Sequence, residues 1–344
     1  MCANTPIVNR LYEKYYILKE TPKNVVSSHW KHYHEMAHVK FRGSEMTIAS
    51  GVGFGDVAHK SFISRIFDSL TIASYLCFLK ERRDILRLMK IARSVANKMG
   101  ISFSYDCFRQ VCSLNLIMKR LKRLPGHRLW VICIGDGYGF LSGLLKECFP
   151  DSLICLVDLG KTLLFQSYHL GMAFPHYKHE AILDANQEER VVSLNADFLY
   201  CPAEYLEQLS VFSFDLGINI ASMQEMNSNS IESYFQFLRQ HMNPENLFYC
   251  CNRVSKIMPA GETSNFFMYP WVAEDRHFID ELCPWHKYFL SYRHSNKGPL
   301  FLNLRIPFVN YFDGQHHHRL SILHCVAERH NKGRTHQFNK SNSN

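Results

Sequence analysis

The sequence predicts an α/β protein built around a doubly wound, mostly parallel sheet. Three observations indicate this fold. A short apolar run at Trp130–Ile134 is followed by a glycine turn and then by apolar residues at helical spacing. Apolar runs and helical patterns alternate from residue 126 onward, as parallel strands and their crossover helices do. Towards the end of that region, segments 288–292 and 300–309 resemble an antiparallel hairpin.

The first part of the chain carries mainly helical signals. Asp84 can cap a helix whose apolar residues recur every three or four positions as far as Gly100. Asp106 can cap a second helix that ends near Gly126. We therefore expect residues 1–125 to form an N-terminal helical cap or arm packed on the sheet domain.

Five parallel strands are expected next, in chain order. Each is a short apolar run bounded by turn residues, which is typical of a strand buried on both faces. They are Trp130–Ile134, Leu153–Val157, Val191–Ala196, Phe214–Ile220 and Leu247–Cys251. Helical patterns separate these strands, so right-handed crossovers should place helices on both faces of the sheet.

The domain boundaries follow from this pattern. The sheet domain is expected to span 126–312. Residues 313–344 are expected to be a polar, flexible tail, because few apolar side chains remain there. His316, His317 and His318 lie in that tail, and their spacing alone does not predict a metal site.

Composition narrows the class of protein. The chain has 344 residues, of which 47% are hydrophobic and 20% charged, and this suits a globular protein with an ample core. No apolar run approaches the ~18 residues of a membrane span. The first residues lack a basic region followed by an apolar one, so no signal peptide is expected. Twelve scattered cysteines without Cys-x-x-Cys spacing indicate free thiols and a cytoplasmic protein.

The net charge of +8 raises the question of a nucleic-acid partner. The densest basic group lies at 119–128, at a helix end just before the first strand. Such a group belongs near the amino-terminal edge of the sheet, whereas ligands bind beyond the carboxyl ends of the strands. We therefore interpret it as a solvated helix end and expect no nucleic-acid partner. The oligomeric state is left open.

The glycine turn after the first strand is the strongest local signal. Gly135, Gly137 and Gly139 let the backbone approach a ligand closely, because a Cβ would be in the way. A dinucleotide fingerprint needs its third glycine where Phe140 stands, so the spacing is Gly-x-Gly-x-Gly instead. Asp158 ends the second strand, and Asp197 ends the predicted third one. Each aspartate could bind a ligand beyond the end of its strand, or it could be the N-cap of the helix that follows.

Three segments together carry a resemblance. Ile134–Gly139, Ser222–Met226 and Asn252–Arg253 resemble class I S-adenosylmethionine (SAM) methyltransferases, and more narrowly the sugar O-methyltransferases of bacterial surface-polysaccharide clusters. The resemblance implies a Rossmann-like, seven-stranded sheet whose last strand is antiparallel, with SAM as cofactor. It also implies a set of cofactor-binding residues: Gly135, Asp136, Gly137, Tyr138, Gly139, Asp158, Ala196, Asp197 and Asn219. One departure is Cys133, which stands where many class I enzymes have an acidic residue.

The same resemblance implies methyl transfer to a sugar or polysaccharide hydroxyl. Glu225 is then the expected catalytic base, because it follows the fourth strand near the transferable methyl group. Gln224, Asn252 and Arg253 are expected to bind the acceptor. Histidines of the N-terminal segment, His29 among them, are second candidates for the base. No metal ligands are indicated, although some sugar methyltransferases use a divalent cation.

Besides a methyltransferase that acts on another small molecule, four alternatives stay open. His34–His38 matches the His-Glu-x-x-His zinc motif, but no third ligand follows it. Tyr15 and Lys19 have reductase spacing, but they precede the glycine turn, which is the wrong order for a nicotinamide-dependent reductase. A nucleic-acid methyltransferase would usually carry prolines after Asn219, and Ile220–Ser222 has none. The fourth alternative is a non-catalytic SAM-binding protein.

Overall fold

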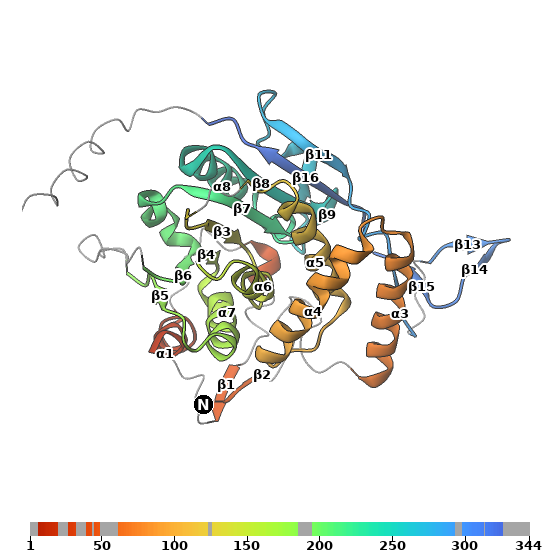
Figure 1. The fold of residues 1–344 in the computed structure, drawn as a ribbon, viewed down its shortest axis with the longest axis horizontal. Helices are drawn as coiled ribbons and strands as arrows, with labels where there is room; N and C mark the ends of the chain where they lie inside the picture. Colours follow the sequence, from red (N-terminus) through yellow and green to blue (C-terminus); the bar gives the residue numbers. More distant parts are fainter. Residues whose placement is uncertain are drawn as a thin grey trace, which may run out of the picture.

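The computed structural model describes residues 6–19, 27–31, 39–42, 45–48, 61–122, 126–184, 195–292, 298–312 and 314–325. Its centre is an eight-stranded sheet in the order β11-β16-β8-β7-β3-β4-β6-β5 (Figure 1). The six strands from β8 to β5 are mutually parallel. Strand β16 runs antiparallel to both of its neighbours, β8 and β11. The expected mostly parallel α/β sheet is therefore confirmed.

The strands of this sheet are short except for β8. Their bounds are β3 Trp130–Ile134, β4 Leu153–Asp158, β5 His179–Ala181, β6 Phe198–Pro202, β7 Phe214–Ile220, β8 Met242–Arg253, β11 Arg276–Leu282 and β16 His316–Ile322. The eighth strand, beyond the seven expected, is the three-residue β5 at one edge.

Helices follow the strands and also make up most of the N-terminal part. Those beside the sheet are α6 Phe140–Cys148, α7 Gly160–Ala173, the 3-10 turns η3 Ala203–Val211 and η4 Met223–Glu225, and α8 Ser228–His241. The N-terminal part contains α1 Pro6–Tyr12, the π-turn η1 Glu13–Ile17, α3 Phe62–Phe78, α4 Arg82–Lys98 and α5 Tyr105–Met118. A hairpin of β1 Val39–Arg42 and β2 Glu45–Ile48 lies between η1 and α3.

Smaller strands extend the molecule beyond the main sheet. They are β9 Ser255–Ile257 with β10 Thr263–Asn265, β12 Tyr288–Leu290 with β15 Val309–Tyr311, and β13 Leu300–Phe301 with β14 Leu304–Arg305. The 3-10 turn η5, Phe266–Met268, follows β10. Figure 1 shows α3 beside β15 at one end of the molecule, with β13 and β14 projecting outward.

Alternation along the strands builds two cores, one on each face of the sheet. On β3, Val131 and Cys133 pack with α4, α5, α6 and α7. Their neighbours Ile132 and Ile134 pack with η3 and α8 on the opposite face. Successive strand residues point to opposite faces, and burial on both faces explains why this strand is a continuous apolar run. The N-terminal helices therefore cover the same face as α6 and α7.

Two N-terminal helices begin slightly earlier than expected. Ser104 caps α5 by accepting a hydrogen bond from the Cys107 amide at 3.4 Å, so Asp106 lies inside the first turn instead. Helix α4 begins before Asp84 and ends just ahead of Gly100, whose φ of +68° suits glycine. The predicted helices are confirmed, with their N-caps displaced by two or three residues, but α5 ends at Met118 and not near Gly126.

The expected antiparallel pairing is present in part, because β12 pairs antiparallel with β15, which begins at Val309. The pair is shorter than expected, with β13 and β14 in the segment between the two strands, and it forms a small separate sheet and not the closing pair of the main one. The antiparallel pair of the main sheet is β11 with β16. The antiparallel strand predicted for this sheet is present, but other residues form it.

The expectation of a flexible tail from residue 313 is wrong for His316–Ile322. These residues are strand β16, which lies between β8 and β11. His318 is fully buried, and its Nδ1 lies 3.0 Å from the Tyr249 hydroxyl. Histidine has an apolar ring with a polar edge, so three consecutive histidines can form a buried strand when the ring nitrogens find partners. Residues 326–344 lie outside the described part of the chain.

The third parallel strand lies later in the chain than predicted. The structure has β6 at Phe198–Pro202, after Asp197, whereas the prediction was Val191–Ala196. Residues 191–194 of that prediction lie outside the described residues.

In the part of the chain that the structure describes, no helix is both long and apolar enough to cross a bilayer.

The buried strand β16 gives a stability prediction. Leu320 is 0% exposed and Leu302 is 82% exposed. Leu320→Ala should lower the free energy of unfolding by about 2–5 kcal/mol, because a cavity replaces the buried side chain. Leu302→Ala should change it by less than about 0.5 kcal/mol. Urea denaturation of the two variants measures both values, and equal values would contradict the central position of β16.

Candidate functional site

A cavity of about 330 Å³ lies at the carboxyl ends of β3, β4, β7 and β8. This is the edge at which parallel α/β sheets bind ligands. Residues of the N-terminal segment and of α5 form its opposite wall. Seven predicted site residues other than Glu225 line it: Gly135, Asp136, Gly137, Tyr138, Asp158, Gln224 and Arg253.

The glycine turn forms the floor of the cavity. Gly135, Gly137 and Gly139 have φ values of +73°, +55° and +83°, a region that side chains with a Cβ rarely adopt. A Cβ on Gly135 would collide with the Ser222 side chain at the end of β7. Gly139 is the N-cap of α6 and packs against Leu170 beneath the cavity. The turn therefore requires glycine for its conformation at all three positions and also for space at Gly135.

Asp136 holds the turn to the helix that follows. Its carboxylate accepts hydrogen bonds from the amides of Leu141 and Ser142, at 3.3 and 2.8 Å. Burial raises the pKa of Asp136 to about 6, although the bonds to Ser142 oppose that rise. Since Asp136 also lines the cavity, this carboxylate both caps α6 and faces the ligand space.

Asp158, the last residue of β4, faces the same space. It accepts hydrogen bonds from the Leu159 amide at 2.8 Å and from Gln166 Nε2 at 2.7 Å. Burial raises the pKa of Asp158 to about 7, and the nearby Asp136 carboxylate adds to the rise. Desolvation without a compensating cation produces such shifts, so this end of the cavity favours hydroxyl donors or a cationic ligand.

An N-terminal residue that the sequence did not single out for this site, Tyr15, packs on the start of α7, two residues after Asp158. The ring of Tyr15 packs so closely on Gly160 that a Cβ there would overlap it. The Tyr15 hydroxyl donates to Glu204 Oε1 at 2.9 Å, and Lys14 Nζ donates to the carbonyl of Leu183 at 2.5 Å. Turn η1 is thus fixed across the start of α7 and η3. Only the match of Tyr15 to an unrelated motif drew attention to this residue.

A buried network of amides ties the ends of β7 and β8 together. Asn219 donates from Nδ2 to the Ile134 carbonyl at 2.9 Å, and its Oδ1 accepts from Asn252 Nδ2 at 2.8 Å. Asn252 Oδ1 accepts from the Gln224 amide at 3.1 Å, and Gln224 Oε1 accepts from the Arg253 amide at 2.8 Å. Asn219 and Asn252 are 0% exposed and do not line the cavity. The structure therefore places these two beneath the site, whereas Gln224 and Arg253 reach it.

Glu225 lies at the rim of the cavity, as the sequence suggested, but it is already paired. Its Oε1 lies 2.6 Å from Lys256 Nζ, and its Oε2 lies 3.4 Å from His29 Nε2. Burial opposes ionisation, but His29 and Lys256 outweigh that effect and lower the pKa of Glu225. Ser27 Oγ donates to its carbonyl at 2.5 Å, so the N-terminal segment docks on this residue. His32 and the zinc-motif residues His34 and His38 lie outside the described residues.

Backbone strain marks the exit of β7. Ala221 lines the cavity with φ of +56°, in the left-handed region that non-glycine residues rarely occupy. Its amide donates to the Cys251 carbonyl at 2.8 Å, and the amide network described above surrounds it. Non-glycine residues held in such conformations cluster at functional sites, where the surrounding structure over-determines them.

Sequence reasoning missed the wall that faces these strand ends. It consists of polar residues of α5 with residues near β16: Asp106, Arg109, Gln110, Phe312 and His316. Arg109 forms an ion pair with Asp106 and lies over the Phe312 ring, 5.2 Å from its centroid. No local pattern indicated these residues, because they come together only when α5 packs on the sheet.

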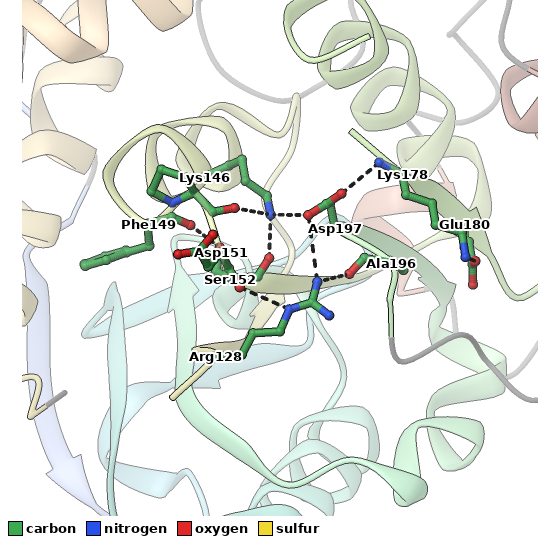
Figure 2. A network of polar contacts seen from close by, with 10 residues as sticks. Arg128, Lys146, Phe149, Asp151, Ser152, Lys178, Glu180, Ala196 and Asp197 are labelled. Carbon is green, nitrogen blue, oxygen red and sulfur yellow. Dashed lines mark hydrogen bonds and ion pairs between the residues drawn. The ribbon is translucent and has the colours of Figure 1, made fainter. Parts of the chain in front are cut away.

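Ala196 and Asp197 are not at the site, so their prediction as cofactor-binding residues is wrong. Both precede β6, and they therefore lie at the amino-terminal edge of the sheet, opposite the cavity. Asp197 Oδ1 lies 3.0 Å from Lys146 Nζ, and its Oδ2 accepts from the Lys178 amide at 2.9 Å (Figure 2). The Ala196 carbonyl accepts from Arg128 at 2.5 Å. These two residues anchor a structural network.

Comparisons with known proteins add structural neighbours but no family assignment. No family model matches the chain, and no curated protein does. Solved structures that match in part include the pyocyanin biosynthetic protein PhzM, at 13% identity and a TM-score of 0.28, over 42% of this chain and 38% of that one. The cyclopropane synthase MmaA2 from Mycobacterium tuberculosis matches at 13% identity and a TM-score of 0.32, over 49% and 63%.

A third neighbour is LepI, solved in complex with SAM, at 10% identity and a TM-score of 0.34, over 60% of this chain and 46% of that one. The chain spans less than two thirds of the length of each of these three structures. We therefore take the fold from the order and direction of the strands themselves.

The network around Asp197 gives a prediction about stability. The side chain of Lys146 is 0% exposed, so removing the charge of its carboxylate partner leaves a buried ammonium poorly compensated. Asp197→Asn should lower the free energy of unfolding by about 1–3 kcal/mol. Glu180→Gln, which breaks the more exposed pair with Lys178, should change it by less than about 0.5 kcal/mol. Urea denaturation tests this, and a neutral Asp197→Asn would contradict the structural role.

Proposed function

We propose that this protein is a SAM-dependent O-methyltransferase that acts on a hydroxyl of a sugar or polysaccharide precursor. The observation that carries the proposal is the position of the Gly135–Gly139 turn and the Asp158 carboxylate around one cavity. The sheet around that cavity contains an antiparallel strand, β16, which is its last strand in chain order and lies between β8 and β11. Methyltransferase sheets have such a strand, whereas dinucleotide-binding sheets usually lack one.

The residues around the cavity fit SAM. Asp158 offers a carboxylate for the two ribose hydroxyls, and burial raises its pKa although Leu159 and Gln166 already donate to it. The backbone of the glycine turn lines the cavity where the methionine part would lie, and Asp136 supplies a carboxyl group beside it. With Cys133 in place of the usual acidic residue, Asp136 is the remaining carboxylate at this end of β3.

The acceptor side of the cavity is polar, which supports a polyhydroxylated acceptor. Arg109 and Gln110 from α5 face Gln224 and Arg253 from the strand ends across it. Side chains of this kind donate and accept hydrogen bonds with sugar hydroxyls. Phe312 lies on the same side and offers an apolar ring to the carbon face of a sugar.

The proposed chemistry divides between cofactor and protein. Bound SAM supplies an electrophilic methyl group on its sulfonium. The protein then has to hold an acceptor oxygen in line with that methyl group and to receive the proton that this oxygen loses. Glu225 lines the cavity and can accept the hydrogen bond of the acceptor hydroxyl.

Lys256 makes Glu225 a weaker base than a free carboxylate, because its ammonium stabilises the ionised form. His29 Nε2 lies 3.4 Å from Glu225 Oε2, so an imidazole is in place beside the carboxylate to share a proton with it. We therefore assign the role of base to the Glu225–His29 pair rather than to Glu225 alone. Glu225 accepts the hydrogen bond of the acceptor hydroxyl and so orients it. The proton that leaves this hydroxyl is shared between Glu225 and His29.

The assignment of SAM is tested by replacing Asp158. Asp158→Asn removes the charge that receives the ribose hydroxyls, so affinity for SAM at about pH 8 should fall about 10–100-fold. Asp151→Asn is the matched control, because Asp151 lies in the turn before β4, away from the cavity. Isothermal titration calorimetry with SAM and with NADH measures the affinities. Unchanged SAM affinity in Asp158→Asn, or tight binding of NADH alone, would overturn the proposal.

The same residue sets an expected pH dependence. The pKa of Asp158 is raised to about 7 in the empty site, and the ionised carboxylate is the better acceptor of two hydroxyls. SAM binding should therefore release a proton below that pKa, and affinity should fall by at most about tenfold per pH unit as the pH drops. Above the pKa the affinity should level off. In Asp158→Asn the dependence between about pH 6 and 8 should disappear.

The Glu225–His29 pair is tested by turnover. Glu225→Gln should lower kcat at least about 100-fold and leave the KM for SAM nearly unchanged, because the pair would no longer receive a proton. Glu262→Gln is the control, since Glu262 contacts the same N-terminal segment through Ser28 but does not line the cavity. Transfer of labelled methyl groups to carbohydrate extracts of the source organism provides the assay. Retained SAM binding with full activity in Glu225→Gln would refute this assignment.

A further inference from the structure

A buried cluster of two thiols and an imidazole lies under the antiparallel end of the sheet. The Sγ atoms of Cys251 and Cys283 and one ring nitrogen of His286 all lie within 4.8 Å of one another. Cys283 Sγ and His286 Nδ1 are 3.1 Å apart. Cys251, Cys283 and His286 are 0%, 1% and 3% exposed, and none of them lines the cavity. The proposed methyl transfer does not use this group.

The fold brings the three side chains together from two elements. Cys251 is near the end of β8 and belongs to the core on the α5 side of the sheet, whereas its neighbour Cys250 belongs to the opposite core. Cys283 follows β11, and its amide donates to the His316 carbonyl at 2.8 Å. The His286 amide donates to the Cys283 carbonyl at 3.1 Å. This turn presents both of its ligand side chains towards β8.

The imidazole of the cluster and that of its neighbour His316 each have a ring nitrogen without a hydrogen-bond partner. His286 Nε2 and His316 Nδ1 are buried without hydrogen-bond partners, and the two rings stack with centroids 4.2 Å apart. The fold therefore keeps an imidazole with an unpaired ring nitrogen buried beside two thiols.

We propose that Cys251, Cys283 and His286 bind a zinc ion. Two thiolates and one imidazole are preferred zinc ligands, with distances of about 2.3 Å to sulfur and 2.0 Å to nitrogen. Ligand atoms that all lie within 4.8 Å of one another can meet such an ion with small side-chain movements. The Cys-x-x-His spacing of Cys283 and His286 matches the short ligand spacing of zinc sites. Three protein ligands leave one coordination position for water.

The charges of this site balance. Binding of Zn²⁺ releases one proton from each thiol, and the resulting thiolates neutralise the two positive charges of the ion. A buried neutral centre of this kind is compatible with the nearby guanidinium groups of Arg109 and Arg253. Because protons compete with the metal for sulfur, zinc affinity should fall as the pH is lowered.

The proposed ion would connect the end of β8 to the turn that follows β11. Asn252 and Arg253 come directly after Cys251, and of these two Arg253 lines the cavity. His316, which stacks on His286, lines the same cavity. The zinc would thus stabilise the acceptor side of the site from behind. This inference does not depend on the proposed function, since it concerns metal binding alone.

The test uses the full chain and neighbouring cysteines. Metal content of the purified protein, and again after incubation with Zn²⁺, should be about one zinc per chain. Cys251→Ser and His286→Gln should each lower zinc affinity at least about tenfold. Cys250→Ser is the matched control, because its side chain points to the opposite core, and it should retain full zinc content. With Co²⁺ in place of zinc, thiolate charge-transfer absorption should appear in the wild type and weaken in Cys251→Ser.

Circular dichroism and thermal unfolding identify variants that fail to fold, and a chelator supplies a second readout. Chelation should lower the Tm of the wild type and of Cys250→Ser but not that of His286→Gln. Absence of bound zinc after incubation, or equal zinc content in Cys251→Ser and Cys250→Ser, would overturn the proposal. A disulfide between Cys251 and Cys283, detected by alkylating the denatured, unreduced protein, would overturn it as well.

Discussion

The site depends on how closely the turn after β3 approaches the end of β7. Gly135 has no room for a Cβ, because Ser222 fills that position. The Ser222 hydroxyl donates to the Ile134 carbonyl at 3.1 Å, and Asn219 donates to the same oxygen at 2.9 Å. These contacts hold two strand ends and a glycine turn in one arrangement. The cavity above them therefore has a rigid floor, built from backbone and buried amides that the protein itself satisfies.

Polar groups on the two sides of that floor have different states. Beneath it, Asn219 and Asn252 use their side chains within the protein, which makes their burial affordable. Above it, burial raises the pKa values of Asp136 and Asp158, because no cation compensates them. The amides that stabilise the fold and the carboxyls that face the ligand space thus lie on the two sides of one thin layer of the structure. Burial makes these two carboxyls difficult to ionise in the free protein, and a ligand with a positive charge or with hydroxyl donors can compensate them.

Local patterns predicted the parts of this fold that local forces determine. Strands β3, β4 and β7 were found as apolar runs, and the glycine turn was found because its backbone conformation requires glycine. Strand β16 was missed because its histidines are polar by composition and become buried only through partners such as Tyr249. Strand β6 was predicted too early in the chain. Asp197 was therefore expected at the carboxyl end of this strand, whereas it precedes the strand. Arg109 reaches the cavity and Tyr15 packs on the start of α7 through long-range contacts, which no local pattern encodes.

The place of β16 has a consequence for synthesis on the ribosome. Residues 316–322 insert between β8 and β11, which are complete at residues 253 and 282. During translation, the edge of β8 and the whole of β11 therefore emerge before the strand that pairs with both. Unpaired edges of this kind can pair with other chains. The sheet can be completed only after residue 322 has left the exit tunnel, so the nascent chain has to protect these two strands until then.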